Sequence, residues 1–302
     1  MRTLKLVLLQ KNMKGLRVLS LFDGISCGMV ALERAEIPIE EYISYEINDD
    51  AIKVSRENYP YIKQCGDVRE ADFTQYKGID ILIGGSPCQN MSTLGDRKGL
   101  VGEKSSLFYE YYRALKEANP KYFLLENNAN MPKKDKEEIT NLLGVKPIMI
   151  DSNLVSCQNR KRLYWTNIPN VNLPKDRNIR LDDVIAKTHK VIKLVPYVEK
   201  KLPLLIDKFG YIPQKFNPYN LSEIKDKCPC LTAEGNSQTK SSSVIMYNGE
   251  CFTMLNAADW ELIQTLPLGY TEILESEGKR KTVIGNGWTI DVIAHIFNGL
   301  KR

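Results

Sequence analysis

A cysteine beside a glycine-rich turn is the first residue in this sequence whose setting suggests covalent chemistry. Residues 84–90 read Gly-Gly-Ser-Pro-Cys-Gln-Asn and follow an apolar run that begins at Ile79. A thiolate presented at the end of a strand can attack an electron-poor carbon, so Cys88 is a candidate nucleophile. An inert, buried thiol would look the same in sequence, and the residues alone leave both interpretations open.

An acid and two arginines follow later apolar runs. Glu126 ends the run that starts at Tyr122, and residues 158–162 read Gln-Asn-Arg-Lys-Arg. Glu126 would bring an acid to the same edge of the sheet as Cys88, and Arg160, Lys161 and Arg162 place three cations together beside the polar amide of Gln158. On its own, however, such a basic run is also typical of an ordinary solvated surface.

Three further positions suggest a nucleoside site. The turn Phe22-Asp23-Gly24 leads directly into a helical pattern, but it lacks the Gly-x-Gly-x-x-Gly spacing of dinucleotide-binding proteins. Glu46, 22 positions beyond Gly24, could accept hydrogen bonds from two ribose hydroxyls, and Asp67 could accept one from an adenine amino group. Either acid could equally be a solvated loop residue.

The elements that must position these residues alternate between strand and helix. Short apolar runs predict strands, and helical spacing predicts the helices between them. Such alternation is typical of an α/β fold with a mostly parallel sheet and helices on both faces, and ligands bind beyond the carboxyl ends of its strands. The expected strands are 16–22, 42–47, 79–84, 122–126, 147–150 and 162–168, and the expected helices are 26–32, 50–59, 105–118 and 135–143.

After about residue 170 the alternation stops, which predicts a separate small lobe. Residues 151–250 hold 16 Lys and Arg against 10 Asp and Glu, a net charge of +6, whereas the whole chain carries +5. A basic segment on a neutral body favours a lobe that binds a polyanion, although a solvated lysine-rich surface would have the same charge. Helical patterns resume from Asn256 and close the chain over 291–300.

Composition excludes several classes of protein. With 43% hydrophobic and 26% charged residues among 302, the chain is neither disordered nor membrane-spanning, and no cleavage site follows its first apolar residues. Seven dispersed cysteines and two distant histidines favour a reducing, cytoplasmic compartment and no metal site. We assign residues 1–14 to an N-terminal extension without a function.

Five short motifs follow one another along the chain: Phe22-Asp23-Gly24, Pro87-Cys88-Gln89, Glu126-Asn127, Gln158-x-Arg160-x-Arg162 and Gly285-Asn286-Gly287. In order and spacing they resemble the motifs of the cytosine-5 DNA methyltransferases, over residues 16–300. The segment 263–271 is similar to bacterial and phage members, and parts of 97–108 and 149–151 are similar to the catalytic domains of the vertebrate de novo enzymes. Asn128 and the Gly287-Trp288 pair depart from the usual motifs.

The resemblance implies a Rossmann-like, S-adenosylmethionine-dependent methyltransferase acting on C5 of a flipped-out cytosine in duplex DNA. Cys88 would add to C6, Glu126 would act at N3, Arg162 would bind O2, and Arg160 would help orient Glu126 and the ring. S-adenosylmethionine would leave as S-adenosylhomocysteine. The implied cofactor contacts are Phe22, Gly24, Glu46, Ile47, Asp67, Val68, Pro87, Leu107, Asn286 and Trp288.

The family also implies a division of the chain. Residues 15–169 would form the catalytic and cofactor-binding domain, 170–255 the target-recognition region, and 256–302 the helices that complete the catalytic domain. We expect a monomeric restriction-modification or phage enzyme in a bacterial or phage-infected cell. Two alternatives stay open: a tRNA methyltransferase, because Cys251-Phe252-Thr253 resembles a tripeptide of those enzymes, and an inactive DNA-binding partner.

Overall fold

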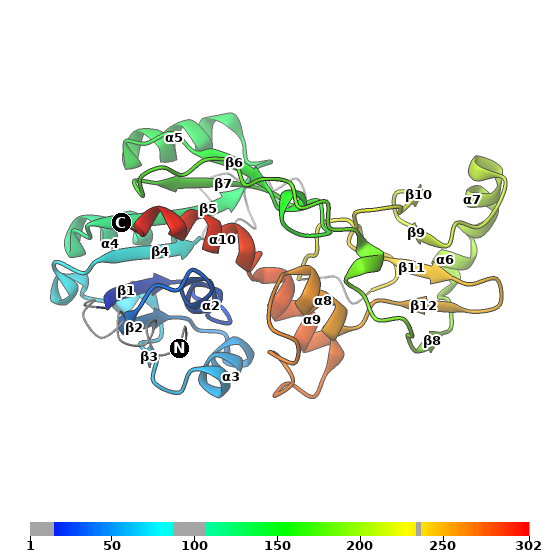
Figure 1. Cartoon of the computed structure of the whole chain (residues 1–302), viewed down its shortest axis with the longest axis horizontal. Coiled ribbons are helices and arrows are strands. Elements are labelled where there is room, and N and C mark those ends of the chain that lie inside the picture. Colours follow the sequence, from blue (N-terminus) through cyan, green and yellow to red (C-terminus); the bar gives the residue numbers. More distant parts are fainter. Residues whose placement is uncertain (1–14, 87–106, 234–236, 302) are drawn as a thin grey trace, which may run out of the picture. The chain divides into compact units, whose positions relative to one another are not determined.

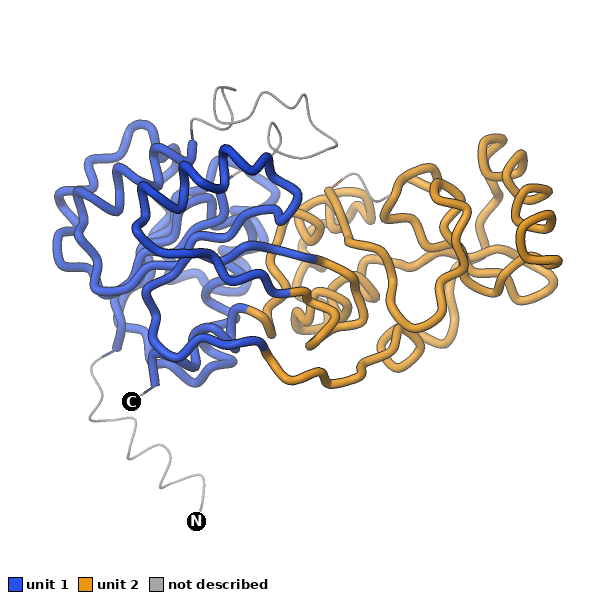
Figure 2. The backbone as a smooth tube through the Cα atoms, turned by 90° about the horizontal axis from the view of Figure 1, so that it is seen from above, with its two compact units in different colours: residues 1–150, 161–173, 293–302 blue, residues 151–160, 174–292 orange. Residues whose placement is uncertain are grey.

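The computed structural model describes residues 15–86, 107–233 and 237–301, so Pro87 and Cys88 lie outside the described residues. The chain divides into two compact units (Figure 2). Unit 1 takes the residues described within 1–150, 161–173 and 293–302, and unit 2 takes those within 151–160 and 174–292. Unit 2 therefore begins with the segment that contains Gln158 and Arg160, and it also holds the motif at 285–287.

Unit 1 is built on a seven-stranded sheet (Figure 1). Adjacent strands from β3 through β2, β1 and β4 to β5 pair in parallel, whereas β7 runs antiparallel to β5. The expected fold class, a mostly parallel sheet with flanking helices, is confirmed. The order across the sheet is β3 (Lys63–Gln64), β2 (Ile39–Tyr45), β1 (Leu16–Leu21), β4 (Ile81–Gly85), β5 (Tyr122–Asn128), β7 (Lys161–Thr166) and β6 (Ile148–Asp151).

The helices of unit 1 pack apolar faces on this sheet. In α4 (Leu107–Ala118) the buried residues Phe108, Tyr111, Ala114 and Ala118 recur at intervals of three and four, which places them on one stripe. They join a core that includes Leu19, Leu82, Leu125 and Trp165, and each large buried side chain stabilises the fold by about 1.5–3 kcal/mol. The other helices are α2 (Cys27–Arg34), α3 (Asp49–Asn58), α5 (Lys133–Leu143) and α10 (Ile290–Phe297), whose last turns belong to unit 1.

Unit 2 contains a five-stranded antiparallel sheet of short strands and four helices among its described residues. Leu194, Val198, Leu205, Phe216 and Ile245 form its own small core. The sheet runs β10 (Ser222–Glu223), β9 (Lys215–Asn217), β11 (Ile245–Tyr247), β12 (Phe252–Met254) and β8 (Val191–Ile192), and the helices are α6 (Pro196–Glu199), α7 (Leu202–Phe209), α8 (Ala257–Ile263) and α9 (Glu277–Asn286).

The expected strands and helices are present, with ends that differ by a few residues. The second strand ends at Tyr45 rather than 47, because the Glu46 carboxylate accepts the N–H groups of Ile47 and Asn48 and turns the chain. The last helix ends at Phe297, and a 3-10 turn, η6 (Asn298–Leu300), follows. The remaining 3-10 turns are η1 (Val68–Glu70), η2 (Phe73–Tyr76), η4 (Ser152–Leu154) and η5 (Leu181–Asp183).

Among the described helices, none has the length and apolar character needed to cross a bilayer.

Candidate active site

Glu126 and Arg162 form an ion pair at the edge of the sheet of unit 1. Arg162 Nε lies 2.9 Å from Glu126 Oε1, and the two side chains are only 15% and 12% exposed. Glu126 pairs with Tyr164 across the antiparallel β5–β7 ladder, so Arg162 is its diagonal neighbour on the same face. The reversal of β7 thus brings the start of this strand, with its arginine, to the carboxyl end of β5.

The segment that leads to Cys88 is attached to the same edge. Gly85 pairs with Glu126 in the parallel β4–β5 ladder. Next to it, the Asn127 side-chain amide donates to the Ser86 hydroxyl at 3.1 Å, and both residues are buried. Ser86 is two positions before Cys88 in the sequence, so the described chain reaches the immediate neighbourhood of Glu126 just before the candidate nucleophile.

The turn after β1 is held in a left-handed conformation. Phe22, Gly24 and Ser26 have φ values of 57°, 59° and 58°, and a position with positive φ favours glycine. Asp23 stabilises this turn, because its buried carboxylate accepts hydrogen bonds of 2.5 to 2.6 Å from the hydroxyl groups of Ser20, Ser26 and Tyr42. Burial raises the pKa of Asp23, and the hydroxyl donors offset part of that effect.

Glu46 connects the ends of β1 and β2. Its Oε2 accepts from the Gly24 N–H at 2.8 Å, and its Oε1 accepts from the Ile47 and Asn48 N–H groups at 2.9 and 2.8 Å. The three backbone donors fix the orientation of the carboxylate at the carboxyl edge of the sheet. Ile47, next to it, is 65% exposed and available to a ligand.

Asp67 and Val68 follow β3. The Asp67 carboxylate accepts from the backbone N–H and the guanidinium of Arg69, and these hydrogen bonds lower the pKa of Asp67. Val68 is buried, and Leu107, the first residue of α4, packs against the core. Unit 1 therefore brings to its sheet the expected cofactor contacts Phe22, Gly24, Glu46, Ile47, Asp67, Val68 and Leu107, whereas Asn286 and Trp288 belong to unit 2.

Arg160 has partners that sequence reasoning did not foresee. Its side chain is buried in unit 2, where the guanidinium donates to the carbonyl oxygens of Leu231 at 2.6 Å, Gly287 at 3.0 Å and Gly285 at 3.3 Å. These bonds link the motif at 285–287 to Leu231 through the Arg160 side chain. No spacing in the sequence signals them, because each joins residues more than 70 positions apart.

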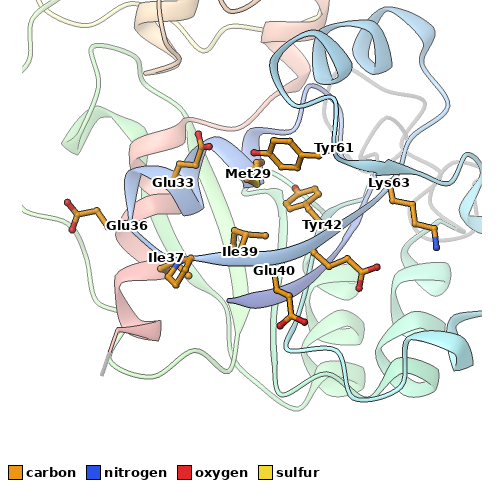
Figure 3. Close-up of a pocket in the computed structure, with 11 residues that line it drawn as sticks. Met29, Glu33, Glu36, Ile37, Ile39, Glu40, Tyr42, Tyr61 and Lys63 are labelled. Atoms are coloured by element: carbon orange, nitrogen blue, oxygen red, sulfur yellow. The ribbon is translucent and has the colours of Figure 1, made fainter. Parts of the chain in front are cut away.

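A hollow of about 660 Å³ lies elsewhere on unit 1 (Figure 3). Met29 and Glu33 from α2, Ile39 and Tyr42 from β2, and Tyr61 surround it. These β2 residues stand at the start and middle of the strand, away from its carboxyl end, so this hollow is not part of the candidate site. No cluster of metal-ligating side chains occurs among the residues that the structure describes.

The family model of the C-5 cytosine-specific DNA methylases matches residues 16–195. The chain belongs to this family. The resemblance noted in the sequence is thereby confirmed.

Named relatives come from phages, bacteria and plants. The chain is 32% identical over 196 residues to the orphan methyltransferase M.Rho11sI of Bacillus phage rho11s, and 40% identical over 112 residues to the type II methyltransferase M.Eco47II of Escherichia coli. These alignments cover 60% and 36% of this chain, but only 39% and 26% of the relatives. The chain thus matches well under half the length of either relative.

Solved structures share the fold over nearly the whole chain. The Entamoeba histolytica methyltransferase EhMeth superposes with a TM-score of 0.75 at 17% identity, covering 96% of this chain and 100% of that one. The Schizosaccharomyces pombe Dnmt2 methyltransferase gives a TM-score of 0.68 at 16% identity, with 95% and 100% coverage. At such low identity the likeness concerns the fold alone.

Proposed function

We propose that the protein transfers a methyl group from S-adenosylmethionine to C5 of cytosine in duplex DNA. The observation that carries this proposal is the buried Glu126–Arg162 pair beside Ser86, two residues before Cys88. A carboxyl group and a guanidinium on one face can act together on a single planar ring, with the cysteine supplying the nucleophile.

The residues of unit 1 fit a nucleoside cofactor. At Gly24 nothing lies within 4 Å of the place that a Cβ would occupy, so the turn leaves room for a close ligand. The fixed carboxylate of Glu46 would accept from ribose hydroxyls, Asp67 from the adenine amino group, and Phe22 and Val68 would supply apolar contact. Ile47, Leu107 and Pro87 would add further contacts, and Asn286 and Trp288 of unit 2 are also proposed as cofactor contacts. The cofactor supplies the activated methyl group when bound.

Cytosine C5 is too weak a nucleophile to take the methyl group unaided. The Cys88 thiolate would add to C6, which gives C5 the character of an enamine carbon. Glu126, protonated, would donate to N3 as negative charge develops, and Arg162 would hold O2. After C5 gains the methyl group, it loses its proton to a base, the C5–C6 double bond forms again, and Cys88 leaves as thiolate.

Arg160 would act indirectly in this scheme. Its guanidinium is occupied by three backbone carbonyls of unit 2, so we propose that it positions the backbone that carries the motif at 285–287. The ring atom C6 is inaccessible in a stacked duplex, and the target base would have to be flipped out, at a few kcal/mol.

Unit 2 would hold the DNA. Residues 170–255 are proposed as the target-recognition region, and 256–302 as the helices that complete the catalytic domain. Seven lysines on this region are exposed, which suits contacts with phosphates: Lys175, Lys187, Lys190, Lys193, Lys200, Lys208 and Lys225.

Labelled methyl transfer tests the proposal. The purified protein, given S-adenosylmethionine with a labelled methyl group, is expected to label unmethylated duplex DNA and not tRNA. Bisulfite sequencing of the product would then locate the methylated sites. Labelling of tRNA alone would replace DNA by RNA as the substrate, and DNA binding without labelling of either would indicate an inactive DNA-binding partner.

A further inference from the structure

Two separate bridges join the peptide of Leu231 to the carbonyl of Gly287 within unit 2. Leu231 belongs to the proposed target-recognition region, and Gly287 stands between the proposed cofactor contacts Asn286 and Trp288. The first bridge is the guanidinium of Arg160, which donates to the carbonyls of both Leu231 and Gly287.

The second bridge consists of two buried glutamines. Gln158 Oε1 accepts from the Leu231 N–H at 3.3 Å, and Gln158 Nε2 donates to Gln264 Oε1 at 2.6 Å. Gln264 Nε2 in turn donates to the carbonyls of Gly287 at 3.1 Å and Ile284 at 3.0 Å. Both glutamine side chains are fully buried, so breaking this bridge would leave donors and acceptors unpaired.

The backbones of the same two segments also touch. A Cβ added at Gly285 would stand 2.5 Å from the Thr232 carbonyl carbon and 2.7 Å from the Ala233 nitrogen. The Thr282 hydroxyl donates to the Ala233 carbonyl at 3.1 Å. Residues 231–233 therefore cannot shift against 285–287 without breaking hydrogen bonds or opening a close-packed contact. A displacement of one segment is then passed on to the other, because close-packed segments have little free volume between them.

We propose that Gln264 is a positioning residue that couples DNA binding to cofactor binding. The side-chain amide of Gln264 forms both halves of the glutamine bridge. Its Nε2 donates to the backbone of the turn at 284–287, and its Oε1 accepts from Gln158, which in turn accepts from the Leu231 N–H. DNA that orders residues 231–233 would thereby order the turn that carries Asn286 and Trp288, and the cofactor would favour the DNA-binding arrangement of residues 231–233 to the same degree. This inference rests on the proposed function.

Binding measurements without turnover test the coupling. The dissociation constant of S-adenosylhomocysteine is measured by calorimetry, with and without a duplex containing the sequence that the wild type methylates. We expect DNA to tighten binding at least about fivefold in the wild type. In Gln264→Met, which keeps the side-chain length but removes the amide, the ratio of the two dissociation constants is expected to fall, although the Arg160 bridge remains.

Ser152→Ala is the matched control. The Ser152 hydroxyl is buried in the same cluster and donates to the Thr289 hydroxyl at 2.9 Å, but it contacts neither Leu231 nor Gly287. The control should lower the melting temperature while keeping the wild-type ratio. Thr289→Val, which removes a hydroxyl donor to Gln264 Oε1, serves as a milder second variant if Gln264→Met does not fold, and is expected to reduce the ratio partly.

Three results would overturn the coupling: a wild type that methylates DNA but shows a ratio of one, an unchanged ratio in Gln264→Met or its replacement Thr289→Val, or an equal loss in Ser152→Ala. A wild type that methylates no DNA would instead contradict the proposed function.

Discussion

Glu126 Oε1 and Arg162 Nε lie 2.9 Å apart on adjacent antiparallel strands of an otherwise mostly parallel sheet. Only the reversal of β7 places the second residue of that strand beside the fifth residue of β5. In the proposed mechanism, the Glu126 carboxyl group that acts at N3 of cytosine therefore has beside it a guanidinium suited to the neighbouring carbonyl oxygen.

Removing the acid of this pair should abolish most turnover. Glu126→Gln keeps the shape of the side chain but cannot deliver a proton, so we expect kcat to fall about 10²–10⁴-fold. Single-turnover methyl transfer measures the effect. Glu137→Gln is the matched control, because Glu137 pairs with Lys133 on the exposed face of α5 and should keep full activity. A rate for Glu126→Gln within a factor of about three of the wild type would contradict the role of this acid.

Glu46 should contribute strongly to the affinity for the cofactor. Glu46→Gln places an amide N–H₂ group among the three N–H donors that now orient the carboxylate. We expect the dissociation constant of S-adenosylhomocysteine, measured by calorimetry, to rise about tenfold or more, since hydrogen bonds to charged groups contribute about 1.5–3 kcal/mol. Glu41→Gln, which loses only a half-exposed pair with Arg17, is the control. Equal dissociation constants of S-adenosylhomocysteine for the wild type, Glu46→Gln and Glu41→Gln would show that Glu46 does not contact the cofactor.

Asp23 should give the fold a measurable pH dependence. Burial raises the pKa of this carboxyl above its value of 3.8 in an unfolded chain. The folded state therefore binds the proton more tightly, so the stability contributed by Asp23 is greatest below pH 3.8 and decreases as the pH rises through the folded pKa. Urea unfolding gives the free energy of unfolding of the wild type and of Asp23→Asn between about pH 3 and pH 8. As the pH increases, the free energy of unfolding of the wild type should decrease relative to that of the variant. A difference that moves the opposite way would show that the hydroxyl donors outweigh burial.

DNA affinity should depend steeply on salt. Contacts between the exposed lysines of unit 2 and phosphates release counterions, so the logarithm of the binding constant should fall linearly with the logarithm of salt concentration. Replacing Lys190 and Lys193 by Gln should reduce the slope, whereas Lys133→Gln on α5 should leave it unchanged. Fluorescence anisotropy of a labelled duplex measures all three proteins, and an unaltered slope in the double variant would exclude these lysines from the DNA interface.

The sequence was sufficient for most of the strands and helices of unit 1. The apolar runs before Asp23, Gly85 and Glu126 predicted strands that the structure contains, because a buried parallel strand leaves a continuous apolar signal. The direction of β7 left no such signal, since alternation and apolar content are the same in either direction. Nor could local pattern foresee the carbonyl partners of Arg160 or the hydrogen bond from Tyr42 to Asp23, because these join segments that are distant in the sequence.

Trapping a covalent complex tests the central claim most directly. The protein is incubated with S-adenosylmethionine and a duplex in which 5-fluorocytosine replaces cytosine, and the product is separated under denaturing conditions and weighed by mass spectrometry. Fluorine at C5 prevents the final loss of a proton, so the account predicts a stable complex joined through Cys88 in the wild type and none in Cys88→Ser. A wild type that methylates ordinary DNA yet forms no adduct, or an adduct of equal yield in Cys88→Ser, would contradict it.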